Sequence, residues 1–133
     1  MDGVAVVSAI TEDSIDTNEG ALYVYREGAA SWSFNQRLEP NFSRTSFMGN
    51  YVSLSGNRIV AGAWFTSYGS NILGGAAMVF EHDWASWVQQ APLFSQTAGS
   101  VALLGTSVAQ FGDTALIGAP GTDQSRGGFF FFF

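Results

Sequence analysis

Short hydrophobic segments alternate with turns rich in Gly, Asn, Asp and Ser along the whole chain. Residues 4–10 are continuously apolar and predict a strand that is buried on both faces. Further strands, rich in β-branched and aromatic residues, are predicted at residues 21–25, 32–38, 50–54, 58–63, 76–80, 87–93, 107–109 and 114–119. No segment has a convincing helical period of apolar residues over two or more turns, so the pattern predicts an all-β fold.

The predicted strands repeat at a nearly constant spacing. Matched residues lie 53 to 56 positions apart: Gly20 and Gly75, Trp32 and Trp87, Leu38 and Leu93, Gly56 and Gly112, and Gly75 and Gly128. The matches keep their order along the chain, which is hard to obtain by chance. A unit of four strands every 55 residues or so indicates consecutive four-stranded antiparallel blades of a β-propeller.

The length of the chain sets how much of a propeller it can form. Propellers close with roughly four to eight blades, whereas 133 residues hold about 2.4 repeats of this size. We therefore predict a single partial propeller domain of about ten strands, divided into a partial blade at 1–46, a full blade at 47–102 and a partial blade at 103–133. Because blades bury their faces on one another, we expect neighbouring blades or self-association to complete it.

Composition narrows the classes of partner and chemistry. The net charge of −6 argues against a nucleic-acid surface, because phosphate binding needs a basic stripe. The chain has no cysteine, which excludes disulfides, thiolate metal sites and a Cys nucleophile. No apolar run approaches the roughly 20 residues of a membrane helix, so we predict no membrane span.

Two stretches carry the motifs of a known repeat family. Residues 104–120 contain Leu104-Gly105, a turn at Gly112-Asp113 and the ending Gly118-Ala119-Pro120. Residues 47–63 repeat this order with Phe47-Met48-Gly49 and Gly62-Ala63. With the flanking stretches, the chain resembles FG-GAP repeat proteins over almost its whole length.

This resemblance implies both a fold and a setting. Such repeats build β-propellers like the head of integrin α-subunits, and they also occur in surface or secreted proteins. It implies an extracellular or cell-surface scaffold that recognises a protein or glycan ligand, with no catalysis of its own. Two alternatives remain open: an accessory propeller of a larger secreted enzyme, and a purely structural repeat array.

The chain departs from the family pattern at identifiable positions. The first repeat lacks its opening strand, and Trp64 stands where the family prefers Pro. Integrin-type repeats carry an Asp-rich calcium loop at the first turn. Here that turn reads Ser55-Gly56-Asn57 or Phe111-Gly112-Asp113. Neither turn has the several carboxylates that Ca²⁺ coordination needs, so the family's calcium site is not carried over.

One acidic loop is the best candidate for a metal site. Residues 12–20 bring Asp13, Asp16, Asn18 and Glu19 close together in the sequence, and their oxygens suit a hard cation. The spacing is not that of an EF-hand loop. We therefore weigh weak Ca²⁺ binding against a plain solvated loop, and we predict no other cofactor.

Aromatic residues supply the candidate ligand contacts. Trp32 and Trp87 occupy equivalent repeat positions and are interpreted as packing residues, because packing repeats from blade to blade and function rarely does. Trp64 and Tyr68 lie in the long loop 64–74, which differs between copies, and are the predicted ligand-binding residues.

Two further residues complete the candidates. His82 is the only histidine and no Gly-x-Ser-x-Gly motif accompanies it, so we interpret it as a solvated turn residue and predict no catalytic site. Asn41 begins the sequon Asn-Phe-Ser, which predicts N-glycosylation if the protein is secreted by a eukaryote.

Overall fold

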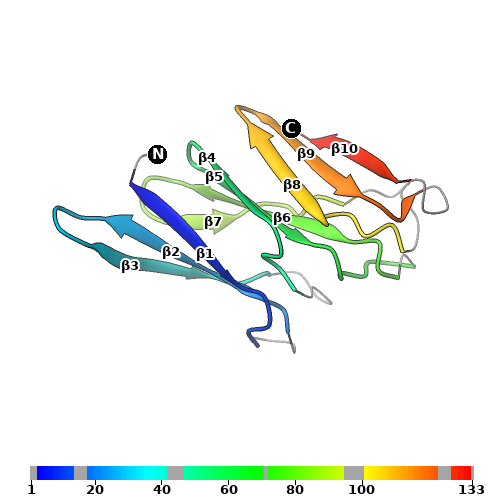
Figure 1. Ribbon diagram of the computed structural model, residues 1–133, viewed down its shortest axis with the longest axis horizontal. Helices are drawn as coiled ribbons and strands as arrows, with labels where there is room; N and C mark the ends of the chain where they lie inside the picture. Colours follow the sequence, from blue (N-terminus) through cyan, green and yellow to red (C-terminus); the bar gives the residue numbers. More distant parts are fainter. Residues whose placement is uncertain are drawn as a thin grey trace.

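A computed structural model describes residues 3–13, 18–41, 47–70, 72–94, 101–122 and 127–132. In these ranges the chain forms ten strands in three antiparallel sheets of three, four and three strands, which follow one another along the molecule (Figure 1). Successive strands are neighbours within each sheet. This confirms the predicted all-β, incomplete propeller of about ten strands.

The strand bounds follow the predicted pattern closely. The first sheet holds β1 (Val4–Ala9), β2 (Ala21–Glu27) and β3 (Trp32–Leu38). The second holds β4 (Val52–Ser55), β5 (Arg58–Ala63), β6 (Ala76–His82) and β7 (Trp87–Gln89). The third holds β8 (Ser107–Phe111), β9 (Thr114–Ala119) and β10 (Gly128–Phe132). Each sheet lies inside one predicted blade, and the blade boundaries themselves stay a prediction.

One predicted strand is shorter than expected. The sequence predicts a continuous strand over residues 87–93, but β7 ends at Gln89. The Gln90 amide still donates to the Val79 carbonyl of β6 at 2.8 Å, and the chain pairs with β6 once more at an isolated bridge between Leu93 and Ala77. Pro92 lies between these two pairings and has no N–H to donate to a neighbouring strand. The fourth strand of this blade is therefore interrupted.

The connections separate the molecule into two ends. Tight turns at residues 28–31, 56–57, 83–86 and 112–113 join strands at one end, which we call the turn end. The longer connections, which include residues 64–75, lie at the opposite end, which we call the loop end (Figure 1). Because consecutive strands are antiparallel, this division is the same in all three sheets.

The sequence repeat is a repeat of backbone geometry. The Gly49 amide donates to the Gly62 carbonyl at 2.8 Å, and the Gly105 amide donates to the Gly118 carbonyl at 3.0 Å. Gly49 and Gly105 also share a left-handed backbone, with φ of 101° and 98°. Each marks the point where the first strand of a blade meets the preceding sheet.

The alignment of one glycine is corrected by the structure. Gly75 has φ 81° and its amide donates to the Thr66 carbonyl at 2.9 Å. Gly127 has φ 88° and donates to the Thr122 carbonyl at 3.0 Å. Gly127, not Gly128, is therefore the counterpart of Gly75, because both stand one residue before a strand. The sequence alignment paired Gly75 with Gly128 because both are glycines, but the two residues occupy different positions relative to their strands.

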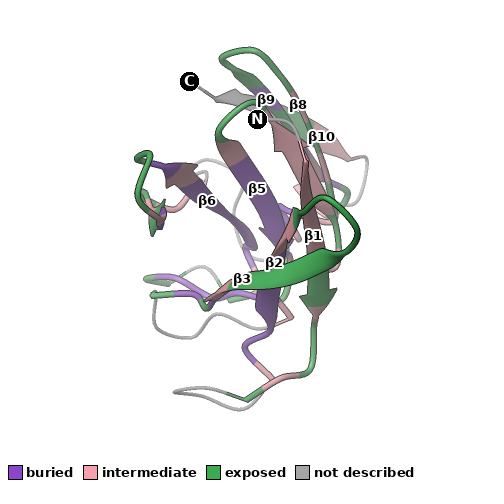
Figure 2. Ribbon diagram, turned by 90° about the vertical axis from the view of Figure 1, so that its left-hand side faces the viewer, coloured by how far each residue is buried: buried purple, intermediate pink, exposed green. Residues whose placement is uncertain are grey.

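Two apolar layers hold the three sheets together. The first layer joins Leu22, Val24 and Leu38 of the first sheet to one face of the second sheet, including Ile59, Met78 and Phe80. The second joins Val60, Ala77 and Val79 on the other face to Ala115, Ile117 and Ala119. The middle sheet is buried on both sides, and Figure 2 shows β5 and β6 mostly in the buried colour.

The first strand does not have the expected burial. Residues 4–10 were predicted to be buried on both faces, but Val7 is 54% exposed and Ser8 is exposed as well. Its repeat counterpart, β5, is almost wholly buried because β4 flanks it and a sheet covers each of its faces. In the described part of the chain β1 is an edge strand with a sheet on one face only.

Candidate functional site

A cluster of three aromatic rings lies at the loop end. Phe47 and Trp64 stack with centroids 6.3 Å apart, and Phe65 meets them edge-on at 5.6 Å and 5.1 Å respectively. Phe65 is 38% exposed, and the other two rings are half-buried. The cluster offers an apolar ring surface, exposed chiefly at Phe65, of the kind that packs against a ligand.

The backbone at a blade junction positions this cluster. Phe47 precedes the first strand of the second blade, and its amide donates to the Asn18 carbonyl of the first blade at 2.7 Å. Trp64 follows directly after β5. Phe47 has φ 55°, a left-handed conformation that a bulky residue rarely adopts. The rings therefore sit where the first and second sheets meet.

The cluster belongs to one repeat only. The positions one repeat later hold Leu103, Pro120 and Gly121 in place of Phe47, Trp64 and Phe65. A side chain at Gly121 would overlap the Val101 carbonyl oxygen, so the third repeat leaves no room for a ring there. Sequence reasoning found Trp64 but missed its two partners, because their contact depends on the Phe47 backbone.

The second predicted ligand contact lies inside the loop. Tyr68 is only 9% exposed, and its ring packs on Phe94 with centroids 4.6 Å apart. Its other side faces Gly74, where an added Cβ would lie 2.9 Å from the ring. The structure therefore places Trp64 at the surface and Tyr68 under cover, and the burial of Tyr68 argues against contact with a ligand in this conformation.

The acidic loop places its described residues in different surroundings. Asp13 is exposed, and its Oδ1 accepts the Asn18 amide at 2.8 Å. Glu19 is 1% exposed. Asp16 lies outside the described residues. Within the described ranges no three His, Asp or Glu side chains gather as metal ligands, and the calcium site stays a prediction.

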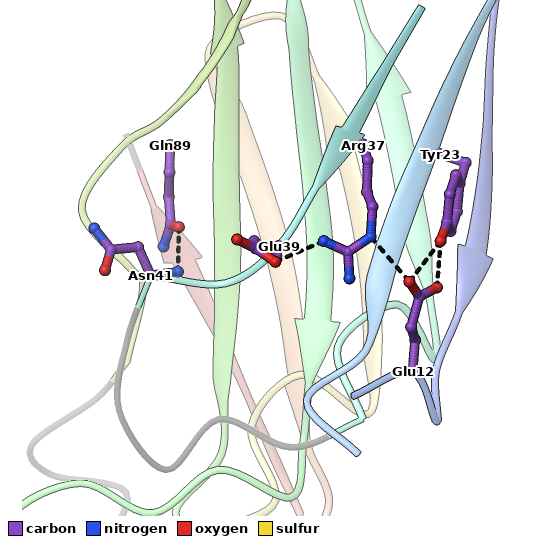
Figure 3. Close-up of polar contacts among 6 residues, drawn as sticks. All are labelled: Glu12, Tyr23, Arg37, Glu39, Asn41 and Gln89. Atoms are coloured by element: carbon purple, nitrogen blue, oxygen red, sulfur yellow. Dashed lines mark hydrogen bonds and ion pairs between the residues drawn. The ribbon is translucent and has the colours of Figure 1, made fainter. Parts of the chain in front are cut away.

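A charged network ties this loop to the first sheet (Figure 3). The Tyr23 hydroxyl donates to Glu12 at 2.6 Å, and Arg37 contacts Glu12 at 2.9 Å and Glu39 at 2.6 Å. The Tyr23 hydrogen bond, with the Arg37 guanidinium, holds the pKa of Glu12 below its usual value. The hydrogen bond to Glu39, followed by those to its other partners, raises the pKa of Arg37.

The network is an anchor for the loop. Its members come from the loop (Glu12), from β2 (Tyr23), from β3 (Arg37) and from the residue after β3 (Glu39), so no local sequence motif predicts it. Sequence reasoning included Glu12 only as part of an acidic run.

The sequon residue lies on the same side of the molecule. The backbone N–H of Asn41 donates to Gln89 Oε1 at 2.6 Å. The exposed side chain of Asn41 points away from Gln89 (Figure 3). The next two sequon residues, Phe42 and Ser43, lie outside the described residues. Glycosylation at Asn41 stays a prediction.

His82 is not the solvated turn residue that the sequence suggested. It is 6% exposed, since β6 continues to His82 and carries the ring into the junction between the first two sheets. Its Nδ1 accepts the Trp84 amide at 3.0 Å, and its Nε2 lies 3.1 Å from Arg26 Nη2. These two neighbours are donors and neither is a nucleophile, which differs from a catalytic triad.

Comparison with known protein families supports the interpretation of the chain as a repeat protein. Residues 87–132, from β7 to β10, match the FG-GAP repeat family. The comparison with curated proteins found no match. The described residues include no helix with the length and apolar character needed to cross a membrane.

Proposed function

Because this chain is an FG-GAP repeat protein, we propose that it is a non-catalytic propeller segment that recognises a protein or glycan ligand outside the cell. Repeats of this family are typical of extracellular proteins, which supports the setting. The surroundings of His82 support the absence of catalysis, because its ring nitrogens face donors only.

The aromatic cluster Phe47–Trp64–Phe65 is the observation that carries this proposal. Packing in a repeat protein recurs from unit to unit, whereas this cluster occurs in one repeat and opens to solvent. Loops at one end of a rigid scaffold are also where binding residues concentrate. Indole and phenyl faces pack against the apolar face of a sugar ring or against an apolar side chain, so both ligand classes fit.

Array binding by the whole protein tests the proposal. We expect specific binding to a subset of glycans or proteins, and a loss of at least tenfold in affinity for Trp64→Ala. Trp32→Ala is the matched control, since Trp32 is also exposed but lies at the turn end, and it is expected to keep full affinity. Trp64→Phe keeps an apolar ring and should retain part of the binding.

Other outcomes identify the alternatives. A well-folded protein that binds nothing on either array favours a purely structural repeat array. Binding that Trp32→Ala and Trp64→Ala weaken equally would show that the cluster is not the contact surface. Hydrolysis of an arrayed substrate would instead favour an enzyme.

A further inference from the structure

A pocket lies on the outer face of the third sheet, close to the turn end. The third sheet stands last in the row of three sheets (Figure 1). The pocket has a volume of about 320 Å³ and is lined by Ala109, Gln110, Phe111, Thr114 and Leu116. Phe111 is 89% exposed and Leu116 is 40% exposed, so the described part of the chain leaves this pocket open.

The second sheet shows what covers the corresponding place in the preceding blade. The Gln110 side chain of β8 reaches over β4 and β5, and its Nε2 donates to the Ser53 carbonyl at 2.7 Å and to the Arg58 carbonyl at 2.9 Å. A carbonyl oxygen has two lone pairs, so it can accept this donor besides one within its own sheet. Two residues before Gln110, Val108 packs against the apolar layer that contains Val60.

The pocket on the third sheet repeats this seat 56 residues later in the chain. The strand register is the same, because Ser53 lies opposite Val60 on the second sheet and Ala109 lies opposite Leu116 on the third. The carbonyls of Ala109 and Thr114 therefore correspond to the two acceptors on the second sheet. The third sheet thus presents the seat for a carboxamide, and nothing in the described part of the chain fills it.

The junction between the first and second sheets is built without a carboxamide. Leu54 stands there at the repeat position of Gln110, and it joins the first apolar layer together with Val4 and Val6 of β1. In the described part of the chain β1 is an edge strand, so the first sheet has no counterpart of β4 and of its carbonyl acceptor. The third sheet has both strands of the seat, β8 and β9. It therefore matches the carboxamide-binding junction and not the apolar one.

A second copy of the chain does not supply this carboxamide. Within the chain the seat on the second sheet is filled from β8, which is the first strand of the covering sheet. If the first sheet of another copy stacked on the third sheet, the described part of that copy would have no strand in the place of β8. The pocket would stay open in such a contact. Its occupant is therefore an extended segment of a different protein.

We propose that this pocket binds an extended strand of a partner protein through a glutamine side chain, with an apolar residue two positions before it. The glutamine carboxamide donates to the carbonyls of Ala109 and Thr114. The apolar residue packs on Leu116, as Val108 packs on the layer that contains Val60. A glutamate in the same place has no donor and would turn its charge toward two carbonyl oxygens. This binding surface is separate from the aromatic cluster at the loop end.

A synthetic peptide with the sequence of residues 106–112, which includes β8, is the probe for the pocket. The methyl signals of Leu116 in the whole chain are followed by nuclear magnetic resonance during titration. We expect a saturable shift, and an affinity weaker by roughly tenfold or more when the peptide carries Gln110→Glu or Gln110→Met, because neither side chain can donate to the two carbonyls. Equal affinity for the Gln and Met peptides would show that the pocket selects only bulk. That result, or no shift with the natural peptide, overturns the proposal.

Two variants of the chain show whether the peptide occupies this pocket. Ala109→Phe fills the pocket from an exposed position on β8 and should weaken the peptide by roughly tenfold or more. Ala85→Phe is the matched control, because Ala85 is also exposed but lies in the turn between β6 and β7. It should keep full affinity. A peptide that binds Ala109→Phe as tightly as the natural chain has paired elsewhere, such as along the edge of β1, and the proposal fails.

The peptide variants test the pocket without any change to the chain, so the result stands even if Ala109→Phe lowers the melting temperature. Trp64→Ala separates this site from the loop-end cluster and should leave the affinity for the peptide unchanged. A loss of affinity in Trp64→Ala would place the peptide at the loop end and overturn the assignment to the pocket. Failure of the pocket leaves the loop-end proposal intact, because array binding depends on Trp64 and peptide binding on Ala109.

Discussion

Gly62 packs directly against the carbonyl oxygen of Gly105, so no side chain fits between the second and third sheets at this point. Gly105 is itself pressed against the Ala76 carbonyl. The second and third sheets are therefore in direct backbone-to-backbone contact at the junction between their blades. This contact is what the recurring glycines of the repeat provide.

Gly62→Ala is therefore expected to destabilise the fold. The added Cβ would overlap the Gly105 oxygen, and such overpacking costs about 1–3 kcal/mol because backbone must move. Chemical denaturation gives the change in the free energy of unfolding. Gly56→Asn is the control: its Cβ meets nothing within 4 Å, and Asn tolerates the left-handed φ of 58°. A similar loss in both variants would contradict the packing argument.

Trp87 and Trp32 are equivalent in sequence but differ in burial. Trp87 is 3% exposed because the first sheet covers it, whereas Trp32 is 50% exposed. Trp87→Ala should lower the free energy of unfolding by about 3–5 kcal/mol, as for other buried aromatic residues. Trp32→Ala should cost less than half as much. Equal costs, measured by denaturation at low protein concentration, would mean that another surface covers Trp32.

The sequence predicted the strands well because each strand has its own local signal. Alternating apolar residues and Gly turns mark β4 and β5 without reference to the rest of the chain. The repeat then supplied the order of the strands, since a spacing of about 55 residues with four strands defines a blade.

The burial of individual side chains was harder to predict, because it depends on which sheets pack against each other. His82 follows an apolar strand and precedes a turn, so its sequence suits a solvated residue, and only the Arg26 contact from another blade reveals its burial. Val7 matches a buried strand in sequence but lies at an outer edge. The candidate site was likewise only partly predictable. The sequence identified Trp64 as a candidate ligand contact, but the contact of Trp64 with Phe47 forms only where two blades meet.

The Tyr23–Glu12 hydrogen bond gives a prediction about pH. The pKa of Glu12 is lowered chiefly by the Tyr23 hydroxyl, so Tyr23→Phe should raise this pKa toward the usual value of 4.5. Carboxyl chemical shifts followed during an acid titration measure it. Tyr25→Phe is the matched control on the same strand, since Tyr25 contacts Phe34, and it should leave Glu12 unchanged. An unchanged pKa in Tyr23→Phe would contradict the assignment.

The sign of the stability change follows from this shift. A carboxyl whose folded pKa is lowered stabilises the fold above its unfolded pKa of about 4.5, and this contribution is lost as pH falls through the folded pKa. The difference in melting temperature between the natural protein and Glu12→Gln should therefore shrink as pH is lowered below 4.5. A difference that grows in acid would show that Glu12 acts in another way.

The outer faces of the two end sheets predict self-association. Val7 and Phe34 are 54% and 58% exposed on the first sheet, and Phe129 and Leu116 are 64% and 40% exposed on the third. By strand register, each pair lies on the face turned away from the middle sheet. In the chain's own junctions such faces pack on a neighbouring sheet, so we expect contacts between copies that join one end sheet to the other.

Sedimentation at several protein concentrations tests this association. We expect the natural chain to form oligomers that dissociate on dilution. Phe34→Lys places a charge on the outer face of the first sheet and should shift the equilibrium toward monomer by at least tenfold in the dissociation constant. Ile72→Lys is the control, because Ile72 is 51% exposed but lies in a loop instead of on a sheet face. A natural chain that stays monomeric at all concentrations would mean that these faces are stable in water without a partner.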